Sequence, residues 1–270
     1  MSPQARPHVV KAHSYGNDFL LVPLSDVSDR NLPALARSMC NRHQGIGADG
    51  LILYETLDNR LRMRLHNADG SASEISGNGV RCLAAYALDQ RWTPHEREVS
   101  IETPAGVKTL QLVERGPGRW TFRAAMGMPS GIRQLEIEAA GERVRSVVLS
   151  VGNPQCVLLE RLDEQRLHKL GAALEHHEAF PGRTNVAFVE VITPKHLRIL
   201  IWERGVGPTA ASGTGACGSA VAAMTYGGAE RTVDVESPGG IQRVEWREDG
   251  LYLTGWAEIL LEGQWVAESA

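Results

Sequence analysis

The chain has 270 residues, and its 28 Lys and Arg against 32 Asp and Glu give a formal net charge of −4 at pH 7. This balance argues against nucleic acid as a main partner, because no block of basic residues offers a stripe for phosphate groups. No apolar run reaches the roughly 18 residues that a membrane helix needs. The first residues also lack the apolar core of a signal peptide, so the sequence favours a cytoplasmic globular protein with no membrane partner.

Strand-like and helix-like segments alternate along the chain. The helices expected over 80–91 and 216–226 are small and apolar nearly all round, which is typical of buried helices. Strand-like segments outnumber helical ones, so we expect an α+β chain. In chain order the expected elements are a strand over 19–24, a helix over 31–41, strands over 51–55 and 61–67, a helix over 80–91, a strand over 146–151, a helix over 162–174, strands over 185–192 and 197–203, and a helix over 216–226.

Two motifs recur about half a chain apart and indicate an internal repeat. Ser76-Gly-Asn-Gly precedes the first apolar helix, and Ser212-Gly-Thr-Gly precedes the second, 136 residues later. The segment IETPAG at 101–106 resembles VESPGG at 235–240, 134 residues later. Because both matches occur in the same order, the chain is expected to contain two similar halves.

The repeat predicts the domain organisation. We place the first half at residues 1–125 and the second at 126–270, with the last strands able to return to the first half. No Pro-rich or charged linker separates the halves, so we expect them to pack together with a ligand cleft between them.

Each Ser-Gly-x-Gly motif opens a buried helix and forms a candidate anion site. The first amide groups of a helix have no intrahelical partner and carry the positive end of the helix dipole. Glycine lets a carboxylate or a phosphate approach this backbone closely. Ser76 and Ser212 would then flank one ligand; the simpler interpretation, that both are plain N-caps, stays open.

Other polar residues lie where expected strands meet glycine-rich loops. Taken singly, each is typical of a turn. Together they favour a pocket rich in amide and guanidinium groups, which suits a small zwitterion with carboxylate and ammonium groups. They are Asn17, Asn67, Asn153, Asn185, Glu203 and Arg204.

The cysteines and histidines show no pattern of a metal site. Cys40, Cys82, Cys156 and Cys217 form no C-x-x-C pair, so we expect four free thiols, mostly buried, and no metal. The run from Gly213 to Gly218 spells G-x-G-x-x-G, but no expected strand ends directly before it. A dinucleotide site is therefore disfavoured.

The chain resembles the diaminopimelate epimerase family, whose members are amino-acid epimerases of lysine and cell-wall precursor biosynthesis. The resemblance runs from Lys11 to Gly255 and depends on several motifs in the right order. It implies two similar halves, each a mixed β-sheet wrapped around a central helix. The motifs are KAHSYGNDF at 11–19, NRHQGIGADG at 41–50, NADGS at 67–71, GNGVRC at 77–82, GNP at 152–154, Thr184-Asn185, ERGVG at 203–207 and GTGAC at 213–217.

The resemblance also implies a reaction. Family members use no cofactor and act as homodimers; one cysteine thiolate removes the α-proton while a second thiol donates a proton to the opposite face. The substrate carboxylate lies on the two helix N-termini, and Glu203 lies near the reacting amino group. Carried over, the carboxylate contacts are Gly77, Asn78, Gly213 and Thr214, and the rest of the small-molecule amino acid is held by Asn17, Asn67, Asn153, Asn185 and Arg204.

This sequence departs from the family pattern at the catalytic positions. Ser76 and Ser212 stand where the family has its two cysteines, and Gln155 stands where it usually has a histidine after G-N-P. A thiol titrates near 8.5, roughly, whereas a serine hydroxyl needs an adjacent base to accept a proton. We therefore expect impaired epimerase activity.

Three accounts of the two serines stay open. The cysteines were changed deliberately, or the protein is a natural divergent isomerase, acting slowly or on another substrate. In the third account it is a natural homologue that binds an amino acid without turning it over.

Overall fold

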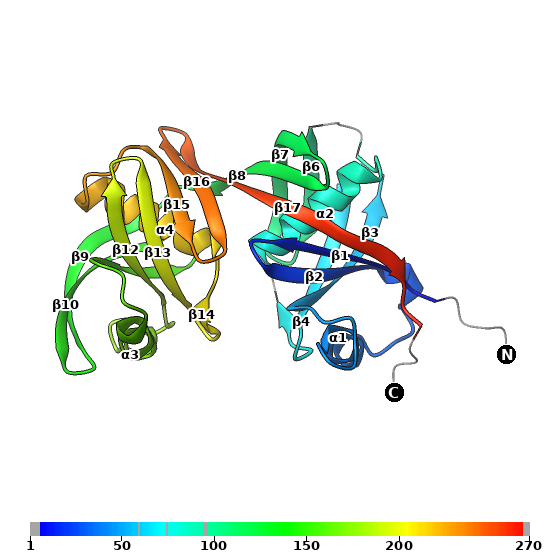
Figure 1. The fold of residues 1–270 in the computed structure, drawn as a ribbon, viewed down its shortest axis with the longest axis horizontal. Coiled ribbons are helices and arrows are strands. Elements are labelled where there is room, and N and C mark those ends of the chain that lie inside the picture. The colour runs from blue at the N-terminus through cyan, green and yellow to red at the C-terminus, as the bar shows by residue number, and fades with distance from the viewer. Residues whose placement is uncertain (1–5, 59, 74, 94–96, 267–270) are drawn as a thin grey trace. The chain divides into compact units, whose positions relative to one another are not determined.

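The computed structural model describes residues 6–58, 60–73, 75–93 and 97–266. The chain packs as two units, one formed by Met1–Ala124 with Trp256–Ala270 and the other by Ala125–Gly255. Strands β8 (Arg119–Gly127) and β17 (Gly250–Gln264) carry the chain from one unit to the other (Figure 1).

The sequence-based division fell at residue 125 and left the last strands able to return to the first half. In the structure, β17 pairs antiparallel with β1 (His8–Ser14), so the strand belongs with the first unit from Trp256 onward. This pairing joins residues about 250 positions apart, and no local sequence pattern reports it.

In the first unit, strands pair in an order that alternates antiparallel and parallel neighbours. β1 pairs antiparallel with β2, β2 parallel with β3, β3 antiparallel with β4, and β4 parallel with β6. β6, β7 and β8 then continue antiparallel. The elements, besides β1, β8 and β17, are β2 (Asn17–Pro23), a 3-10 helix (Leu24–Asp26), α1 (Leu32–Cys40), β3 (Gly50–Leu57), β4 (Arg60–Asn67), β5 (Ala72–Ser73), α2 (Gly77–Asp89), β6 (Glu98–Thr103) and β7 (Gly106–Gly116).

In the second unit, the same pairing order recurs. β10 pairs antiparallel with β11, β11 parallel with β12, β12 antiparallel with β13, and β13 parallel with β15. β15, β16 and the start of β17 continue antiparallel. The elements are β9 (Ser130–Ala139), β10 (Glu142–Ser150), β11 (Pro154–Leu159), α3 (Glu164–Glu175), β12 (Asn185–Thr193), β13 (His196–Glu203), β14 (Gly207–Thr209), α4 (Gly213–Tyr226), β15 (Thr232–Ser237) and β16 (Gly240–Arg247).

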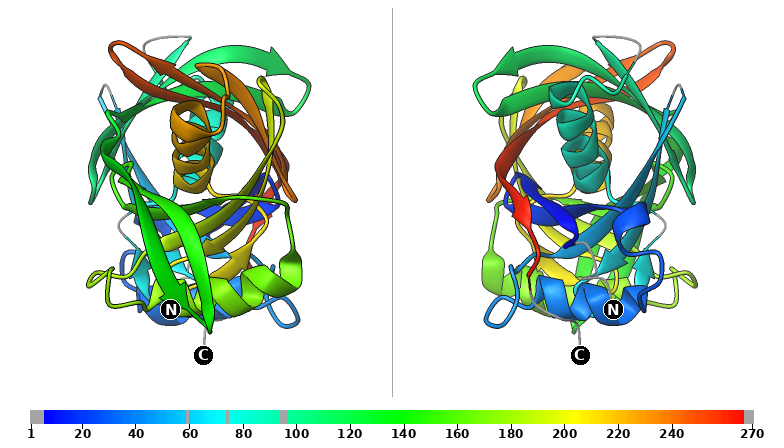
Figure 2. Two further views of the ribbon diagram at one scale, coloured as in Figure 1. Left: turned by 90° about the vertical axis from the view of Figure 1, so that its left-hand side faces the viewer. Right: turned by 90° about the vertical axis from the view of Figure 1, so that its right-hand side faces the viewer.

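Each unit encloses one helix. Leu83 and Ala84 of α2 are fully buried against strand residues such as Ile52 and Phe122, and Ala220 and Val221 of α4 are buried in the same way. The strands of each unit surround its helix (Figure 2). Because both helices are apolar nearly all round, enclosure by a sheet removes most of their surface from water, and this burial stabilises each unit.

The second helix of each unit packs on the outer side of the sheet. Leu35 and Met39 of α1 lie against Leu20 and Leu53 in one core cluster. In the other unit, Leu167, Leu170 and Leu174 of α3 pack with residues of β11 and β12. The apolar positions of α1 and α3 recur every three or four residues, so one face is buried and the other faces water.

The motifs that recur in the sequence have the same local structure in both units. The Thr103 hydroxyl donates to the carbonyl of Gly106 at 2.7 Å, and the Ser237 hydroxyl donates to the carbonyl of Gly240 at 3.2 Å. These bonds close the β6–β7 and β15–β16 turns. The predicted α+β class and the two similar halves, each a mixed sheet around a central helix, are confirmed.

The four helices expected from the sequence are confirmed, and each expected strand overlaps an observed one. The sequence analysis missed β1, β5 to β9, β11 and β15 to β17. β7 and β9 are largely exposed with an irregular burial pattern, whereas β6 and β15 alternate in burial. The sequence analysis also missed β14, which lies between the end of β13 and the G-x-G-x-x-G run.

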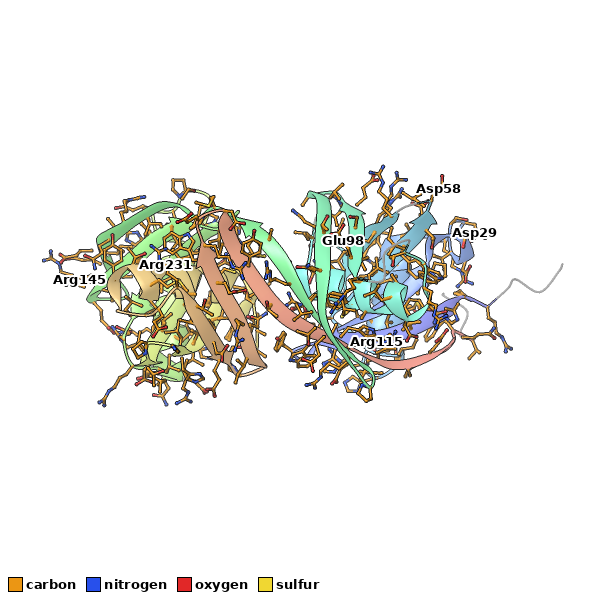
Figure 3. All side chains as sticks on the ribbon, turned by 90° about the horizontal axis from the view of Figure 1, so that it is seen from above. Asp29, Asp58, Glu98, Arg115, Arg145 and Arg231 are labelled. Carbon is orange, nitrogen blue, oxygen red and sulfur yellow. The ribbon has the colours of Figure 1, made fainter. Side chains whose placement is uncertain are left out.

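Charged side chains lie on the outside of both units. Asp29 and Asp58 of the first unit and Arg145 and Arg231 of the second are exposed, and Figure 3 shows them at the surface. Among the described helices, none is long and apolar enough to cross a membrane.

Removing a buried side chain from α2 tests its role as a core element. Leu83→Ala is expected to lower the free energy of unfolding by about 2–5 kcal/mol, because it leaves a cavity in a filled core. Leu260 is 52% exposed. Leu260→Ala is therefore expected to change the free energy by about 0.5 kcal/mol or less. Equal losses in denaturant titrations of the two variants would contradict the burial of α2.

Candidate active site

The first half-site lies at the N-terminus of α2. Ser76 is the N-cap, and its hydroxyl accepts a hydrogen bond from the amide of Gly79 at 3.2 Å. Ser76 has an extended backbone, with φ −130° and ψ 121°, which is usual for an N-cap. The amides of Gly77 and Asn78 have no intrahelical acceptor, so they are available to an anion.

The second half-site repeats this geometry at the N-terminus of α4. Ser212, with φ −139° and ψ 127°, is the N-cap, and its hydroxyl accepts from the amide of Gly215 at 3.3 Å. Gly213 and Thr214 are the first residues of the helix. The two serines therefore occupy equivalent positions in their units and serve as N-caps, which is the simpler of the two interpretations offered by the sequence.

A hydrogen bond between two side chains holds each helix start in place. In the first unit, the Asn78 side chain donates to the Asn17 side-chain oxygen at 3.1 Å. In the second, Asn153 donates to the Thr214 hydroxyl at 3.2 Å. Asn17 and Asn153 are 136 residues apart, as are Asn78 and Thr214. The repeat thus extends beyond the serines to the polar side chains around them.

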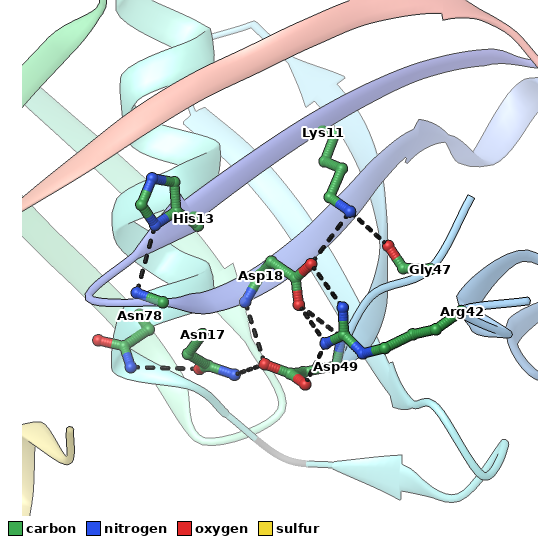
Figure 4. A network of polar contacts seen from close by, with 9 residues as sticks. Lys11, His13, Asn17, Asp18, Arg42, Gly47, Asp49 and Asn78 are labelled. Carbon is green, nitrogen blue, oxygen red and sulfur yellow. Dashed lines mark hydrogen bonds and ion pairs between the residues drawn. The ribbon is translucent and has the colours of Figure 1, made fainter. Parts of the chain in front are cut away.

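The Asn17 side chain is fixed by a charged network that the sequence analysis did not identify. It donates to Asp49 at 2.8 Å, and Asp49 in turn accepts from Arg42 at 2.8 Å (Figure 4). Arg42 also contacts Asp18, to which Lys11 forms an ion pair at 3.1 Å. Burial raises the pKa of Asp18, but the hydrogen bonds from Arg42 and Lys11 outweigh it and hold that pKa below its usual range.

The Asn78 side chain is held from its other end by Arg81. The Arg81 guanidinium donates to the Asn78 side-chain oxygen at 2.7 Å and to the hydroxyl of Ser14 at 3.3 Å. Arg81 is 3% exposed. Both substrate-binding candidates at this half-site, Asn17 and Asn78, therefore have fixed orientations before any ligand binds, which lowers the entropic cost of binding.

At the second half-site, Ser212 has a carboxylate partner, which Ser76 does not have among the described residues. The Ser212 hydroxyl donates to the Oε2 atom of Glu203 at 3.0 Å. β14 pairs antiparallel with the end of β13, and this hairpin returns the chain so that Ser212 lies beside Glu203. Burial raises the pKa of Glu203, and the hydroxyls of Thr209 and Ser212 offset part of that rise.

Asn67 occupies the corresponding place in the first unit. It ends β4 as Glu203 ends β13, it lies 136 residues before Glu203, and each precedes its serine by nine residues. Asn67 is exposed, and its side chain donates to the Ser71 hydroxyl at 2.9 Å. An amide cannot accept a proton at neutral pH, so the two half-sites differ chemically at this position.

Asn185 and Arg204 serve the local structure of the second half-site. The Asn185 side chain donates to the carbonyl of Pro154 at 3.0 Å and accepts from the Arg204 amide at 3.0 Å. It thus ties the start of β11 to the end of β13. The exposed Arg204 guanidinium donates to the carbonyl of Gly182 at 3.0 Å.

Gln155, the departure noted after G-N-P, is 1% exposed and has a structural partner. Its side chain donates to the Asn153 side-chain oxygen at 2.7 Å and so orients the amide that contacts Thr214. Its side chain also packs closely on Gly218 of α4. Gln155 therefore fixes the orientation of Asn153 beside the helix start. Its amide can neither donate nor accept a proton as an acid or base at neutral pH.

The buried carboxylate of Glu175 holds the segment around Glu203 in place, and sequence reasoning missed it. Glu175, the last residue of α3, accepts from the indole of Trp202 at 2.8 Å and from the amide of Gly205 at 2.8 Å. Burial raises its pKa, but these hydrogen bonds and the neighbouring His176 and Arg183 outweigh it, so its pKa lies below the usual range. Its burial distinguishes Glu175 from other glutamates at helix ends, and burial cannot be read from the sequence.

The thiols are unsuited to proton transfer. Cys40, Cys82, Cys156 and Cys217 are free and buried, as the sequence predicts. Burial raises the pKa of the Cys40 and Cys156 thiols to about 12 and raises that of Cys82 further. In the described part of the chain, no group of three or more His, Cys, Asp or Glu side chains is arranged as a metal site.

Solved structures with the same architecture show the fold class. A predicted epimerase from Pseudomonas aeruginosa matches with a TM-score of 0.72 and 16% identity, covering 98% of this chain and 100% of the other. A hydroxyproline epimerase from Agrobacterium vitis matches with a TM-score of 0.67 and 15% identity, covering 96% and 90%. The fold is the two-half fold of these epimerase structures.

Sequence comparison then identifies the family. The diaminopimelate epimerase family model matches residues 9–132 and 147–260. The diaminopimelate epimerase of Desulforudis audaxviator is 42% identical, covering 95% of this chain and 98% of the relative. That of Desulfitobacterium hafniense is 39% identical, covering 94% and 96%. The chain belongs to the diaminopimelate epimerase family.

The raised pKa of Glu203 predicts how stability changes with pH. The unfolded carboxyl ionises near pH 4.3, roughly, whereas the folded one keeps its proton to higher pH, so the protein loses stability as pH rises through this interval. Glu203→Gln is therefore expected to exceed the wild type in stability at pH 7 and to match it below about pH 4.

Glu258 supplies a control of opposite sign. Burial raises its pKa, but hydrogen bonds from Arg119 and His13 outweigh it and leave that pKa below its usual range. Glu258→Gln is therefore expected to destabilise the protein at pH 7, with the loss shrinking as pH falls. Thermal melts of both variants from pH 3 to 8 check the two signs. A Glu203→Gln variant less stable than the wild type at pH 7 would contradict the assigned environment.

Glu175→Gln tests the clamp on the Trp202–Gly205 segment. A glutamine has one acceptor oxygen, so one of the two buried donors loses its partner, at a cost of about 1–3 kcal/mol in unfolding free energy. Glu164→Gln removes a charge from the exposed first turn of the same helix and is expected to cost about 0.5 kcal/mol or less. Denaturant titration compares the unfolding free energies of the two variants. Equal losses would contradict the role of Glu175 in holding the Trp202–Gly205 segment.

Proposed function

We propose that the protein is an isomerase that inverts the α-carbon of diaminopimelate or a closely similar diamino dicarboxylate. The observation that carries this proposal is the pair of equivalent N-cap serines, Ser76 and Ser212, each at the start of a buried helix. They lie within motifs shared with relatives named diaminopimelate epimerase. The reaction belongs to lysine and cell-wall precursor biosynthesis.

The helix N-termini supply the binding energy for the substrate carboxylate in this proposal. Removing the α-proton places negative charge on the carboxylate as an enolate develops. Free amides at Gly77, Asn78, Gly213 and Thr214, together with both helix dipoles, stabilise that charge. Asn17, Asn67, Asn153, Asn185 and Arg204 are the proposed contacts for the remaining polar groups, with Asn185 acting through its hold on the loops at Pro154 and Arg204.

Proton transfer in the proposal uses the serines with Glu203. A serine hydroxyl accepts a proton only when a neighbouring base takes its own, and Glu203 accepts the hydrogen bond of Ser212. A serine hydroxyl is a weaker acid than a thiol and a poorer proton acceptor than a thiolate. The reaction is therefore expected to be slow. We further propose that it uses no cofactor and takes place in a cytoplasmic homodimer, as the family resemblance implies.

A second candidate function is amino-acid binding without turnover. Among the described residues, no carboxylate or imidazole forms a hydrogen bond with Ser76, so one face of the substrate has no evident base. A third is isomerisation of another amino or hydroxy acid with the serines in place. All three functions predict a bound carboxylate, and proton exchange separates them.

Deuterium incorporation into diaminopimelate in D₂O, detected by mass, tests the proposal. The wild type is expected to incorporate deuterium at the α-carbon, and Ser76→Cys with Ser212→Cys is expected to raise the rate by about 100-fold or more. Ser76→Ala with Ser212→Ala controls for background exchange. Thermal stabilisation by diaminopimelate without uptake would favour the binder. Uptake into another acid only would favour the divergent isomerase.

A further inference from the structure

The two half-sites are structural copies with one chemical difference. Ser76 and Ser212 each cap a buried helix and accept one backbone amide, at 3.2 and 3.3 Å. Nine residues before each serine, the neighbouring strand ends in Asn67 in one unit and in Glu203 in the other. The second half-site therefore contains a proton acceptor at a position where the first contains an amide.

The Ser212–Glu203 contact has the geometry of a proton relay. The hydroxyl donates to the carboxylate at 3.0 Å and accepts from the amide of Gly215, so both of its hydrogen-bonding directions are set. Ser212 is 5% exposed, whereas Ser76 is more accessible to solvent. A buried hydroxyl with a fixed acceptor loses little entropy when it transfers a proton.

Glu203 is also free of the cations that would weaken it as a base. Among the described residues, burial and the Thr209 and Ser212 hydroxyls are what act on its carboxylate, and the neighbouring Arg204 guanidinium donates to a backbone carbonyl instead. Burial without a neutralising charge favours the protonated carboxyl, so the carboxylate has a stronger affinity for a proton than an exposed glutamate has.

We propose that the two proton transfers are unequal: Ser212 with Glu203 removes and returns the α-proton on its own face of the substrate faster than Ser76 completes inversion. The inference rests on the proposed function and deepens it. The protein thereby has a second activity, the exchange of an α-hydrogen with solvent at retained configuration, for one stereoisomer of its amino-acid substrate.

The proton balance of the exchange step involves the substrate, two side chains and water. The α-C–H bond breaks, and its electron pair remains on the substrate as an enolate. Ser212 Oγ accepts the α-proton as its own proton passes to Oε2 of Glu203. The Ser212 hydroxyl, which now carries the α-proton, exchanges it for deuterium from D₂O. In the reverse sequence Oγ donates the deuteron to the α-carbon on the same face while Oε2 of Glu203 returns its proton to Oγ.

Stereochemically pure diaminopimelate isomers in D₂O measure the inequality directly. For one isomer, deuterium uptake is expected to exceed inversion by at least 10-fold. For the isomer that differs at the reacting carbon, uptake is expected to equal inversion, because Ser76 must then remove the proton. Uptake equal to inversion for both isomers would overturn the inference.

Ser212→Ala and Ser76→Ala form a matched pair of variants. Each removes an N-cap hydroxyl that accepts one amide, so their effects on folding are similar. Ser212→Ala is expected to reduce the retentive exchange by at least about 100-fold, whereas Ser76→Ala leaves it within a few-fold and lowers inversion. Equal losses of retentive exchange in the two variants would contradict the assignment.

Two carboxyl variants locate the base. Glu203→Gln is expected to abolish the retentive exchange, because Gln accepts the Ser212 hydrogen bond without accepting its proton. Glu74, two residues before Ser76 in the sequence, lies outside the described residues. Glu74→Gln is expected to retain the exchange, and its loss in that variant would overturn the inference.

Failure of the inference and failure of the proposed function give different results. If the wild type and the double-cysteine variant neither exchange nor invert diaminopimelate, the proposed function fails and the inference fails with it. If the double-cysteine variant inverts while the wild type shows equal exchange and inversion for both isomers, the proposed function stands and only the inference is overturned.

Discussion

The unpaired amide groups at the starts of α2 and α4 are the constraint on which the rest of the site depends. Enclosing an apolar helix within a sheet buries its sides but leaves its first amides without intrahelical acceptors. Ser76 and Ser212 satisfy one amide each. The remaining amides and the helix dipoles favour a carboxylate at each start, so the core packing of each unit prepares a binding site.

The internal repeat contains two such helix starts, and the side chains around them differ where the neighbouring strand ends. The hydrogen bonds of Asn78 with Asn17 and of Asn153 with Thr214 join equivalent positions, although the helix residue donates in the first and accepts in the second. The ends of β4 and β13 differ chemically, because one carries an amide and the other a carboxylate. A substrate that must be deprotonated on one face and reprotonated on the other makes use of this difference. The same difference is a disadvantage for an enzyme that must invert both stereoisomers at equal rates.

Local patterns in the sequence predicted the helices, the repeat and the loop residues, because a capping serine, a glycine and an apolar face act over a few positions. These local patterns did not predict contacts that depend on tertiary packing. The Ser212–Glu203 bond depends on the β13–β14 hairpin, which no periodicity marks. Glu175 reaches Gly205 across 30 residues. The sequence analysis allowed the last strands to return to the first half, but it could not name β1 as the partner of β17. The family resemblance identified Glu203 but implied a contact with the amino group.

A crystal structure of the protein with bound diaminopimelate tests the central claim most directly. The account predicts Ser212 Oγ about 3–3.5 Å from the reacting α-carbon, with its hydrogen bond to Glu203 retained and the substrate carboxylate on the helix amides. A structure in which Glu203 binds the substrate ammonium group and no longer contacts Ser212 would contradict it, because the carboxylate would then orient the substrate instead of accepting its proton.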